Sequence, residues 1–333
     1  MKRVAIIGAG SWGTALGIVA AELGHNVKLW SRNPGIVAAI NSNRLNSVYL
    51  PDAPVPSGVF ATTEFGEALE QAELVIIATP SHATRAVLES MAVALTPEVV
   101  LVSATKGIEI ESGKRISQLV DDVLGDEFAA RFVCLSGPSF AKEVVQRHPT
   151  AIVAASTDAA LSTAVQSAFS SASLRIYTNE DVAGTEIGGS VKNVMAIAAG
   201  MVSGLGLGSN SVAALITRGL AEMSRLAIAE GGRLETIMGL AGLGDLVLTC
   251  TGSLSRNRFV GQELGRGRSL TDITSGMKEV AEGINTTRAL KLLANRVGVE
   301  MPITEEVFGV LYEGKKVRDA ANDLMTRPLR DEF

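Results

Sequence analysis

The chain has 333 residues, about two domains of ordinary size, and its 47% hydrophobic and 20% charged residues exclude an intrinsically disordered protein. Its net charge is 30 − 35 = −5 and only 4% of its residues are aromatic. Nucleic-acid-binding surfaces are basic and often carry aromatic stacking platforms, so these values indicate a globular protein without a nucleic-acid partner.

The first half of the chain alternates short apolar runs with stretches of helical spacing. The predicted strands are Arg3–Ile7, Val27–Trp30, Leu74–Ala78, Val99–Ser103, Phe132–Leu135, Ile152–Ala155 and Leu174–Tyr177. Helical patterns such as Thr14–Leu23 and Ala83–Leu95 lie between most of them. This alternation predicts an α/β fold, a doubly wound, mostly parallel sheet of the Rossmann type with helices on both faces.

The first predicted strand runs into Gly8-Ala9-Gly10-Ser11-Trp12-Gly13, a GxGxxG motif at the start of a helix. In this context the motif is typical of dinucleotide binding. Gly8 permits the tight turn, Gly10 lets the backbone approach a pyrophosphate, and Gly13 lets helix and strand pack closely. The N-terminus of the helix attracts the phosphates. The alternative is a glycine-rich turn that binds nothing.

The end of the second predicted strand bears on the choice of dinucleotide. An acidic residue there would bind the ribose 2′-hydroxyl of NAD, but the run Leu29-Trp30-Ser31-Arg32-Asn33 has none. Ser31 and Arg32 suit the 2′-phosphate of NADP, so we expect NADPH to be preferred. A solvated surface arginine is the alternative, and NADH is not excluded.

Loops that follow neighbouring strands meet at one edge of a parallel sheet, where ligands bind. Three such loops contain Gly, Pro and hydroxyl residues: Thr79-Pro80-Ser81, Thr105-Lys106-Gly107 and residues 136–142. Because Lys106 follows a strand directly, it could attract an anionic substrate there. A solvated lysine is the alternative.

From Asp181 onward the pattern is helical almost throughout, with long apolar segments over Val182–Val202, Val212–Glu230 and Thr286–Asn295. The change predicts a dinucleotide-binding domain over residues 1–180 and an all-α substrate and catalytic domain over residues 181–333.

Lys192 is the one lysine in a strongly apolar helical segment. Its neighbours on the helix face are small: Gly188, Gly189, Ala196 and Ala199. We expect the space above the two glycines to leave room for a ligand beside the amine. Burial and a nearby Lys106 would lower the pKa of Lys192, which suits an amine that exchanges a proton with a carbonyl oxygen. A snorkelling structural lysine is the alternative.

Two further segments carry candidate residues. Asp245 lies in a Gly/Leu run, where it either forms a turn or helix cap, or binds a substrate hydroxyl or the Lys192 ammonium. Ser255 can cap the helix that Arg256 and Asn257 begin, and a helix N-terminus beside an arginine suits a phosphate. An ordinary capped helix is the alternative.

Several absences narrow the function. The three histidines, His25, His82 and His148, lack an obvious carboxylate partner and are predicted to be structural or exposed. No cluster has metal-ligand spacing, so no metal is expected. Cys134 and Cys250 lie in apolar runs and are predicted to be buried free thiols. Two cysteines cannot form a disulfide framework, and this fits a protein of the reducing cytoplasm. The chain has no run of eighteen apolar residues, so no membrane-spanning helix is expected. The oligomeric state is open, with a homodimer as one possibility.

Eight motifs together resemble the bacterial-type NAD(P)-dependent glycerol-3-phosphate dehydrogenases over nearly the whole chain. They are GAGSWGTAL, ATPSH, TKGIE, SGPSFAKEV, GGSVKN, TRGLAEM, GLAGLGDLVLTC and SRNR. The resemblance implies reversible reduction of dihydroxyacetone phosphate to sn-glycerol 3-phosphate, which supplies phospholipid synthesis in the cytoplasm.

The resemblance also implies roles for individual residues, with Lys192 as the proton donor and acceptor. Cofactor contacts fall on Ser11, Trp12, Arg32, Lys106, Ala141, Arg256, Val280 and Glu282, the last two on the nicotinamide side. Substrate contacts fall on Lys106, Gly137, Ser139, Lys192, Asp245, Ser255, Arg256 and Asn257.

Two alternative functions remain open on the residues. A lysine-dependent β-hydroxyacid or ketopantoate-type reductase would bind a carboxylate in place of the phosphate. A non-catalytic NADP-binding sensor would not need a buried lysine.

Overall fold

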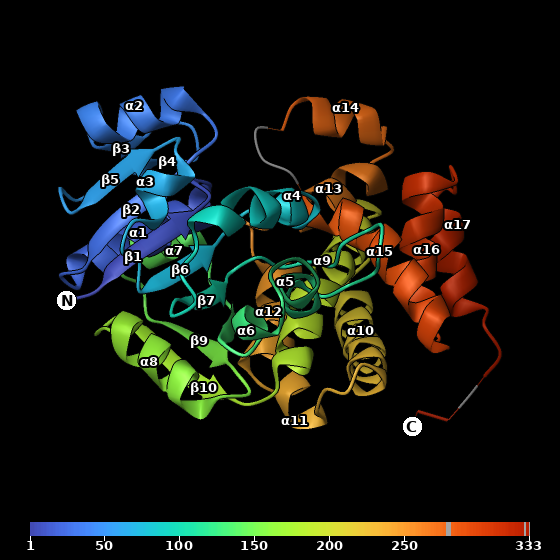
Figure 1. Ribbon diagram of the computed structural model, residues 1–333. Coiled ribbons are helices and arrows are strands. Elements are labelled where there is room, and N and C mark those ends of the chain that lie inside the picture. Colours follow the sequence, from blue (N-terminus) through green and yellow to red (C-terminus); the bar gives the residue numbers. More distant parts are fainter. Residues whose placement is uncertain (278–280, 330, 333) are drawn as a thin grey trace.

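The computed structural model describes residues 1–277, 281–329, 331 and 332. A sheet flanked by helices forms the N-terminal half of the chain, and a cluster of helices beside it forms the C-terminal half (Figure 1). The change comes between strand β10, which ends at Asn179, and helix α9, which begins at Val182.

Within the described residues, the main sheet has eight strands in the order β10-β9-β8-β7-β6-β1-β2-β5. Their bounds are β1 Arg3–Ile7, β2 Asn26–Trp30, β5 Val59–Thr62, β6 Leu74–Ile77, β7 Val100–Ser103, β8 Phe132–Ser136, β9 Thr150–Ala155 and β10 Leu174–Asn179. Neighbouring strands are parallel except β8 and β9, which are antiparallel. A separate antiparallel hairpin, β3 (Leu45–Asn46) with β4 (Leu50–Pro54), lies outside this sheet.

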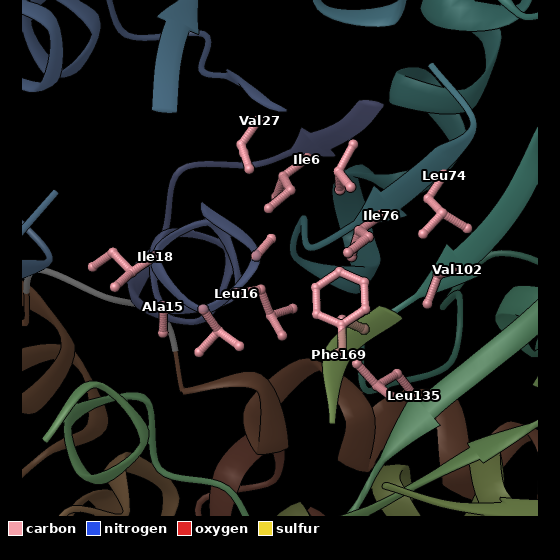
Figure 2. Close-up of a cluster of buried hydrophobic side chains, with 14 of the residues drawn as sticks. Ile6, Ala15, Leu16, Ile18, Val27, Leu74, Ile76, Val102, Leu135 and Phe169 are labelled. Atoms are coloured by element: carbon pink, nitrogen blue, oxygen red, sulfur yellow. The ribbon is translucent and has the colours of Figure 1, made fainter. Parts of the chain in front are cut away.

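Apolar strands are buried on both faces because helices cover the sheet on both sides. These helices are α1 Ser11–Glu22, α2 Pro34–Asn43, α3 Phe65–Leu69, α4 Ser81–Met91 with a 3₁₀ turn Ala92–Ala94, α5 Ile116–Leu124, α6 Asp126–Ala129, α7 Ala141–Val145 and α8 Ala159–Phe169. Figure 2 shows part of one core, in which side chains from strands β1, β6, β7 and β8 lie around α1 and Phe169.

In the C-terminal half, α9 (Val182–Gly204) is the central helix, buried from Gly184 to Met201. Around or beyond it lie α10 Ser209–Ala229, α11 Leu234–Ile237, the π-turn η2 Leu240–Gly244, α12 Asp245–Thr251, α13 Arg256–Gly265, α14 Leu270–Ser275, α15 Glu282–Val297, α16 Pro302–Tyr312 and α17 Val317–Met325. Helices α9 and α13 meet backbone to backbone: a Cβ atom on Gly261 would lie 1.9 Å from the carbonyl oxygen of Ile197. Only glycine allows this approach.

The predicted strands and the helical C-terminal half are confirmed, with strand ends shifted by up to two residues. Strand β5 and the β3–β4 hairpin were not predicted. All of them are short and lie at or beyond the edge of the sheet, and the hairpin contains two prolines, so none forms a long apolar run that stands out in the sequence.

One stretch, Leu234–Thr251, has the length and the mean hydropathy, 1.3, of a membrane-spanning helix. This is weak evidence for a span, because core helices can have the same composition and 44% of the stretch is already buried in the protein. The stretch also consists of three short pieces, α11, η2 and α12.

A buried ion-pair network joins the two halves. The Glu186 carboxylate of α9 accepts hydrogen bonds from the Arg115 guanidinium at 2.7 Å and from the backbone N–H of Ser117 at 2.7 Å. Arg115, which precedes α5, also donates to Glu230 at the end of α10. The Glu186 side chain is 4% exposed, so its charge depends on these donors.

We expect Glu186→Ala to lower the free energy of unfolding by about 3 kcal/mol, because it leaves the buried Arg115 charge with only one of its two carboxylate partners, Glu230. Urea unfolding followed by circular dichroism measures the change. Glu180→Ala is the control, since the Glu180 side chain is 66% exposed in its pair with Arg233 and should matter little. Equal losses in both variants would contradict the role of the network.

Candidate active site

A cavity of about 850 Å³ lies along the carboxyl edge of strands β1, β2, β6 and β7 and is closed on one side by the helical half. Its walls include most of the residues singled out in the sequence: Gly8, Gly10, Ser11, Trp12, Arg32, Lys106, Ser139, Ala141, Lys192, Ser255, Arg256, Asn257 and Glu282. Gly13, Gly137 and Asp245 lie behind this wall, and Val280 lies outside the described residues.

The three motif glycines form a tight turn between β1 and α1. Gly8 has φ +121°, and a Cβ atom there would lie 2.6 Å from the carbonyl oxygen of Ala78. A Cβ on Gly13 would lie 1.9 Å from the carbonyl oxygen of Gly8, so the helix can pack on the strand only through glycine. A Cβ on Gly10 would meet no atom within 4 Å, which leaves this part of the turn open toward the cavity.

This cradle fits a dinucleotide. The open backbone at Gly10 and the N-terminus of α1 suit a pyrophosphate, because the first N–H groups of a helix attract anions. Arg32 is exposed beside the buried Ser31 at the end of β2, where a ribose 2′-substituent would lie. No carboxylate occupies residues 30–33.

One buried carboxylate holds two lysine side chains together. Asp245, at the start of α12 and 1% exposed, accepts a hydrogen bond from Lys192 Nζ at 2.9 Å and another from Lys106 Nζ at 2.6 Å. Lys106 comes from the sheet half and Lys192 from α9, so the two halves supply one charged cluster. Of the alternatives for Asp245, the structure confirms the contact with the Lys192 ammonium.

The environment of this cluster changes its pKa values. Burial lowers the pKa of Lys192 to about 8, and the Lys106 charge lowers it too, while Asp245 opposes both. Burial raises the pKa of Asp245, but the two ammonium groups outweigh it and hold that pKa below its usual value. Lys192 is therefore an amine that can gain or lose a proton near neutral pH.

The prediction of free space for a ligand above Gly188 and Gly189 of α9 is wrong. A Cβ on Gly188 would lie 2.5 Å from the carbonyl oxygen of Ala241, and one on Gly189 would lie 2.8 Å from Ser136 Oγ. The glycines make room for the η2 backbone and for strand β8, with Lys106 beside it, rather than for a ligand. The Lys192 amine meets the cavity on another side, next to Asn193 and Thr249.

Helix α13 begins at the cavity wall, as predicted. Ser255 Oγ accepts a hydrogen bond from the Arg258 N–H at 3.2 Å, which confirms the cap. Asn257 is buried, and its amide bonds to Asn193 Oδ1 at 2.9 Å and to the N–H of Gly283 at 2.9 Å. These bonds tie α13 to α9 and α15, and they leave the helix N-terminus and Arg256 facing the cavity.

The loops from the sheet half reach the same place. Lys106 Nζ donates to the carbonyl oxygen of Gly137 at 3.0 Å, and Ser139 Oγ donates to that oxygen at 2.9 Å. Across the cavity, Glu282 accepts a hydrogen bond from Ser81 Oγ at 2.9 Å. Burial raises the pKa of Glu282 despite this bond.

Two residues of the site were missed in the sequence. Thr249 Oγ1 accepts a hydrogen bond from Lys192 Nζ at 2.9 Å and donates one to the Asp245 carbonyl at 2.6 Å. Asn193, the next residue to Lys192 on α9, accepts the hydrogen bond from Asn257 that ties α9 to α13. The signal for Thr249 was its position four residues after Asp245, which places both on one helix face.

The histidines are elsewhere or peripheral. His25 holds a turn, since its ring contacts the N–H of Lys2 and the carbonyl oxygen of Ala168, which confirms a structural role. His82 lies at the cavity wall, 3.5 Å from the amide of Asn285. Among the described residues, no three His, Cys, Asp or Glu side chains are placed to hold a metal ion.

The arrangement can bind a dinucleotide at one end of the cavity and an anion at the start of α13. Between them it offers an amine with a lowered pKa. An amine in this position can donate a proton to, or accept one from, an oxygen atom beside a bound nicotinamide.

Comparison with known proteins agrees with this geometry. Residues 3–162 match the model of the NAD-dependent glycerol-3-phosphate dehydrogenase N-terminus, and residues 181–322 match that of its C-terminus. Glycerol-3-phosphate dehydrogenase [NAD(P)+] of Koribacter versatilis is 52% identical over 100% of this chain and 99% of its own. A crystal structure of glycerol-3-phosphate dehydrogenase from Coxiella burnetii has a TM-score of 0.94 at 38% identity, covering 98% of this chain and 99% of that one.

A more distant likeness bears on one alternative. A PanE/ApbA family ketopantoate reductase from Ralstonia eutropha has a TM-score of 0.60 at 18% identity, over 97% of this chain and 99% of that one. At this identity the likeness concerns the fold alone. By its sequence and its structure, the chain belongs to the NAD-dependent glycerol-3-phosphate dehydrogenase family.

Proposed function

We propose that the protein reversibly reduces dihydroxyacetone phosphate to sn-glycerol 3-phosphate with NADPH or NADH. The observation that carries this proposal is the Lys192 amine, paired with Asp245 and facing the same cavity as the GxGxxG turn. Residues 1–180 serve as the dinucleotide-binding domain and residues 181–333 as the substrate domain. In the cell this reaction supplies phospholipid synthesis.

The residues divide the work by position. The Gly8–Gly13 turn holds the diphosphate, Arg32 the 2′-phosphate of NADP, and Trp12, Ala141 and Glu282 the remaining wall of the cofactor site. The phosphate of the substrate binds at the N-terminus of α13 beside Arg256, because that end of a helix carries a partial positive charge and Arg256 adds a cation. Lys106 adds a second positive charge near the substrate.

Lys192 handles the proton. When bound, the reduced nicotinamide supplies the hydride that the C2 carbon takes up. The Lys192 ammonium donates a proton to the C2 oxygen, and in the reverse direction the neutral amine accepts it. Asp245 and Thr249 orient the amine from behind, so that its remaining N–H group faces the substrate.

The location belongs to the same proposal. Cys134 and Cys250 are buried free thiols, the usual state of cysteine in a reducing compartment, and this supports a cytoplasmic location. A homodimer stays an untested expectation.

Turnover is tested by the decay of nicotinamide absorbance with dihydroxyacetone phosphate. We expect Lys192→Met to lower kcat by about 10²–10⁴-fold, because it removes the proton donor and keeps most of the side-chain length, while NADPH still binds in calorimetry. Inorganic phosphate should compete with the substrate. Near-normal kcat in the variant would contradict the role of Lys192, and wild-type protein without turnover would contradict the function itself.

The pH dependence follows from the lowered pKa of Lys192. Reduction needs the ammonium form, so its kcat/KM should fall as the pH rises through about 8. Oxidation needs the neutral amine, so its kcat/KM should rise up to about pH 8 and then level off. Asp245→Asn removes a charge that favours the ammonium, so it should move both limbs to lower pH. A profile that is flat between pH 6 and 9 would exclude this assignment.

Cofactor choice is tested at Arg32. We expect Arg32→Ala to raise the KM for NADPH by about tenfold and to change that for NADH little, because only NADPH carries the 2′-phosphate. The control is Arg175→Ala, an exposed arginine on β10 that lies over the Tyr177 ring, away from the cavity. Equal effects on both cofactors would reject the 2′-phosphate contact.

A further inference from the structure

We propose that Asn46 is a positioning residue for cofactor binding: from the β3–β4 hairpin, its side-chain amide sets the orientation of the GxGxxG turn. This inference rests on the proposed dinucleotide site. It assigns a task to the hairpin, a short element that lies outside the main sheet and that contributes no residue to the proton-transfer cluster.

Asn46 is 0% exposed, and its partners use both ends of its amide. Nδ2 donates to the carbonyl oxygen of Ala9 at 2.9 Å and to Thr14 Oγ1 at 2.8 Å, while Oδ1 accepts from the N–H of Tyr49 at 3.2 Å. A carbonyl oxygen can only accept and a backbone N–H can only donate, so these partners determine which amide atom lies on which side.

The bond to Ala9 has a direct consequence for the next residue. The Ala9–Gly10 peptide is trans, so its carbonyl and its N–H point in opposite directions. When Asn46 holds the Ala9 carbonyl on the hairpin side, the Gly10 N–H is directed to the other side. Ala9 and Gly10 both line the cavity, and nothing lies within 4 Å of a Cβ atom on Gly10. The Asn46 amide thereby sets the direction of an N–H group at the place where the diphosphate must bind.

The hairpin holds the turn at two more points. Thr14, 1% exposed in the first turn of α1, accepts the second Nδ2 hydrogen of Asn46. Ser11 Oγ donates to the carbonyl oxygen of Tyr49 at 2.8 Å. Residues 46–49 thus contact the turn at its entrance, its middle and the start of the helix.

A turn with three glycines needs such support. Glycine reaches many backbone conformations, and Gly8 at φ +121° lies in a region that other residues rarely adopt. Ordering the turn only when the cofactor arrives would cost affinity, and contacts that order it beforehand avoid that loss. Asn46 is the buried side chain that makes two of these contacts.

We test this with Asn46→Ala and a matched control, Asn41→Ala. Asn41 also bonds a backbone through its amide, donating to the Ala61 carbonyl at 2.8 Å and accepting from the Ala61 N–H at 2.8 Å. It lies in the same half of the chain, on α2, but it does not line the cavity or contact the turn. Both variants lose an amide that is bonded to backbone, and only Asn46→Ala releases the turn.

Calorimetry with NADPH alone gives the main result. We expect Asn46→Ala to raise the Kd for NADPH by about tenfold, with kcat at saturating NADPH and the KM for dihydroxyacetone phosphate within about twofold of wild type. Asn41→Ala should lower the Tm and leave the Kd unchanged. A wild-type Kd in Asn46→Ala, or equal increases in both variants, would overturn the proposal.

A second pair of variants decides the case if Asn46→Ala does not fold. Thr14→Val removes the hydroxyl that accepts a hydrogen bond from Asn46 and should raise the Kd for NADPH. Thr14→Ser keeps the hydroxyl and should have the wild-type Kd. Equal Kd values in the two Thr14 variants would count against the proposal. The readout needs no substrate, so wild-type protein that binds NADPH but does not turn over would contradict the proposed reaction and leave the Asn46 result interpretable.

Discussion

The site depends on the charge balance around Asp245. A carboxylate that is 1% exposed is tolerable only because two ammonium groups and a helix N-terminus compensate for its lost hydration. The same pairing keeps Lys192 within reach of a proton at neutral pH, since without Asp245 burial would lower its pKa further. One interaction therefore joins the two halves of the chain and sets the acidity of the candidate proton donor.

Close backbone packing makes that pairing possible. The glycines of α9 let the η2 turn and strand β8 approach the helix, and this approach brings α12 and the Lys106 loop to the same point. At the other end of the cavity, the motif glycines let α1 pack against β1 and β6. At the glycines of α9 and at the GxGxxG turn alike, glycine allows close contact within the protein, and the open space for a ligand lies beside these contacts.

The family motifs and the alternation of strands and helices were enough to predict the Rossmann-type half, the helical half and most of the cavity wall. Strand β5 was not predicted because it is only four residues long, and the β3–β4 hairpin because its apolar residues are few and interrupted by proline. The expectation of free space above Gly188 and Gly189 failed for a different reason. A helix face made of small residues indicates that another group packs closely against it, but the sequence does not show whether that group is a ligand or another part of the protein.

The sequence by itself determined the local chemistry: a glycine turn after a strand, a lone lysine in an apolar helix, and a capped helix that begins with arginine. These features depend on neighbours within a few residues, so spacing alone reveals them. Only the tertiary structure decided that Asp245 pairs with both lysines, that Thr249 and Asn193 complete the cluster, and that Asn46 grips the turn. The hydrogen bonds that make these contacts join residues 32 to 139 positions apart in the chain. Such distances in the chain are closed by packing, and packing is a property of the whole fold.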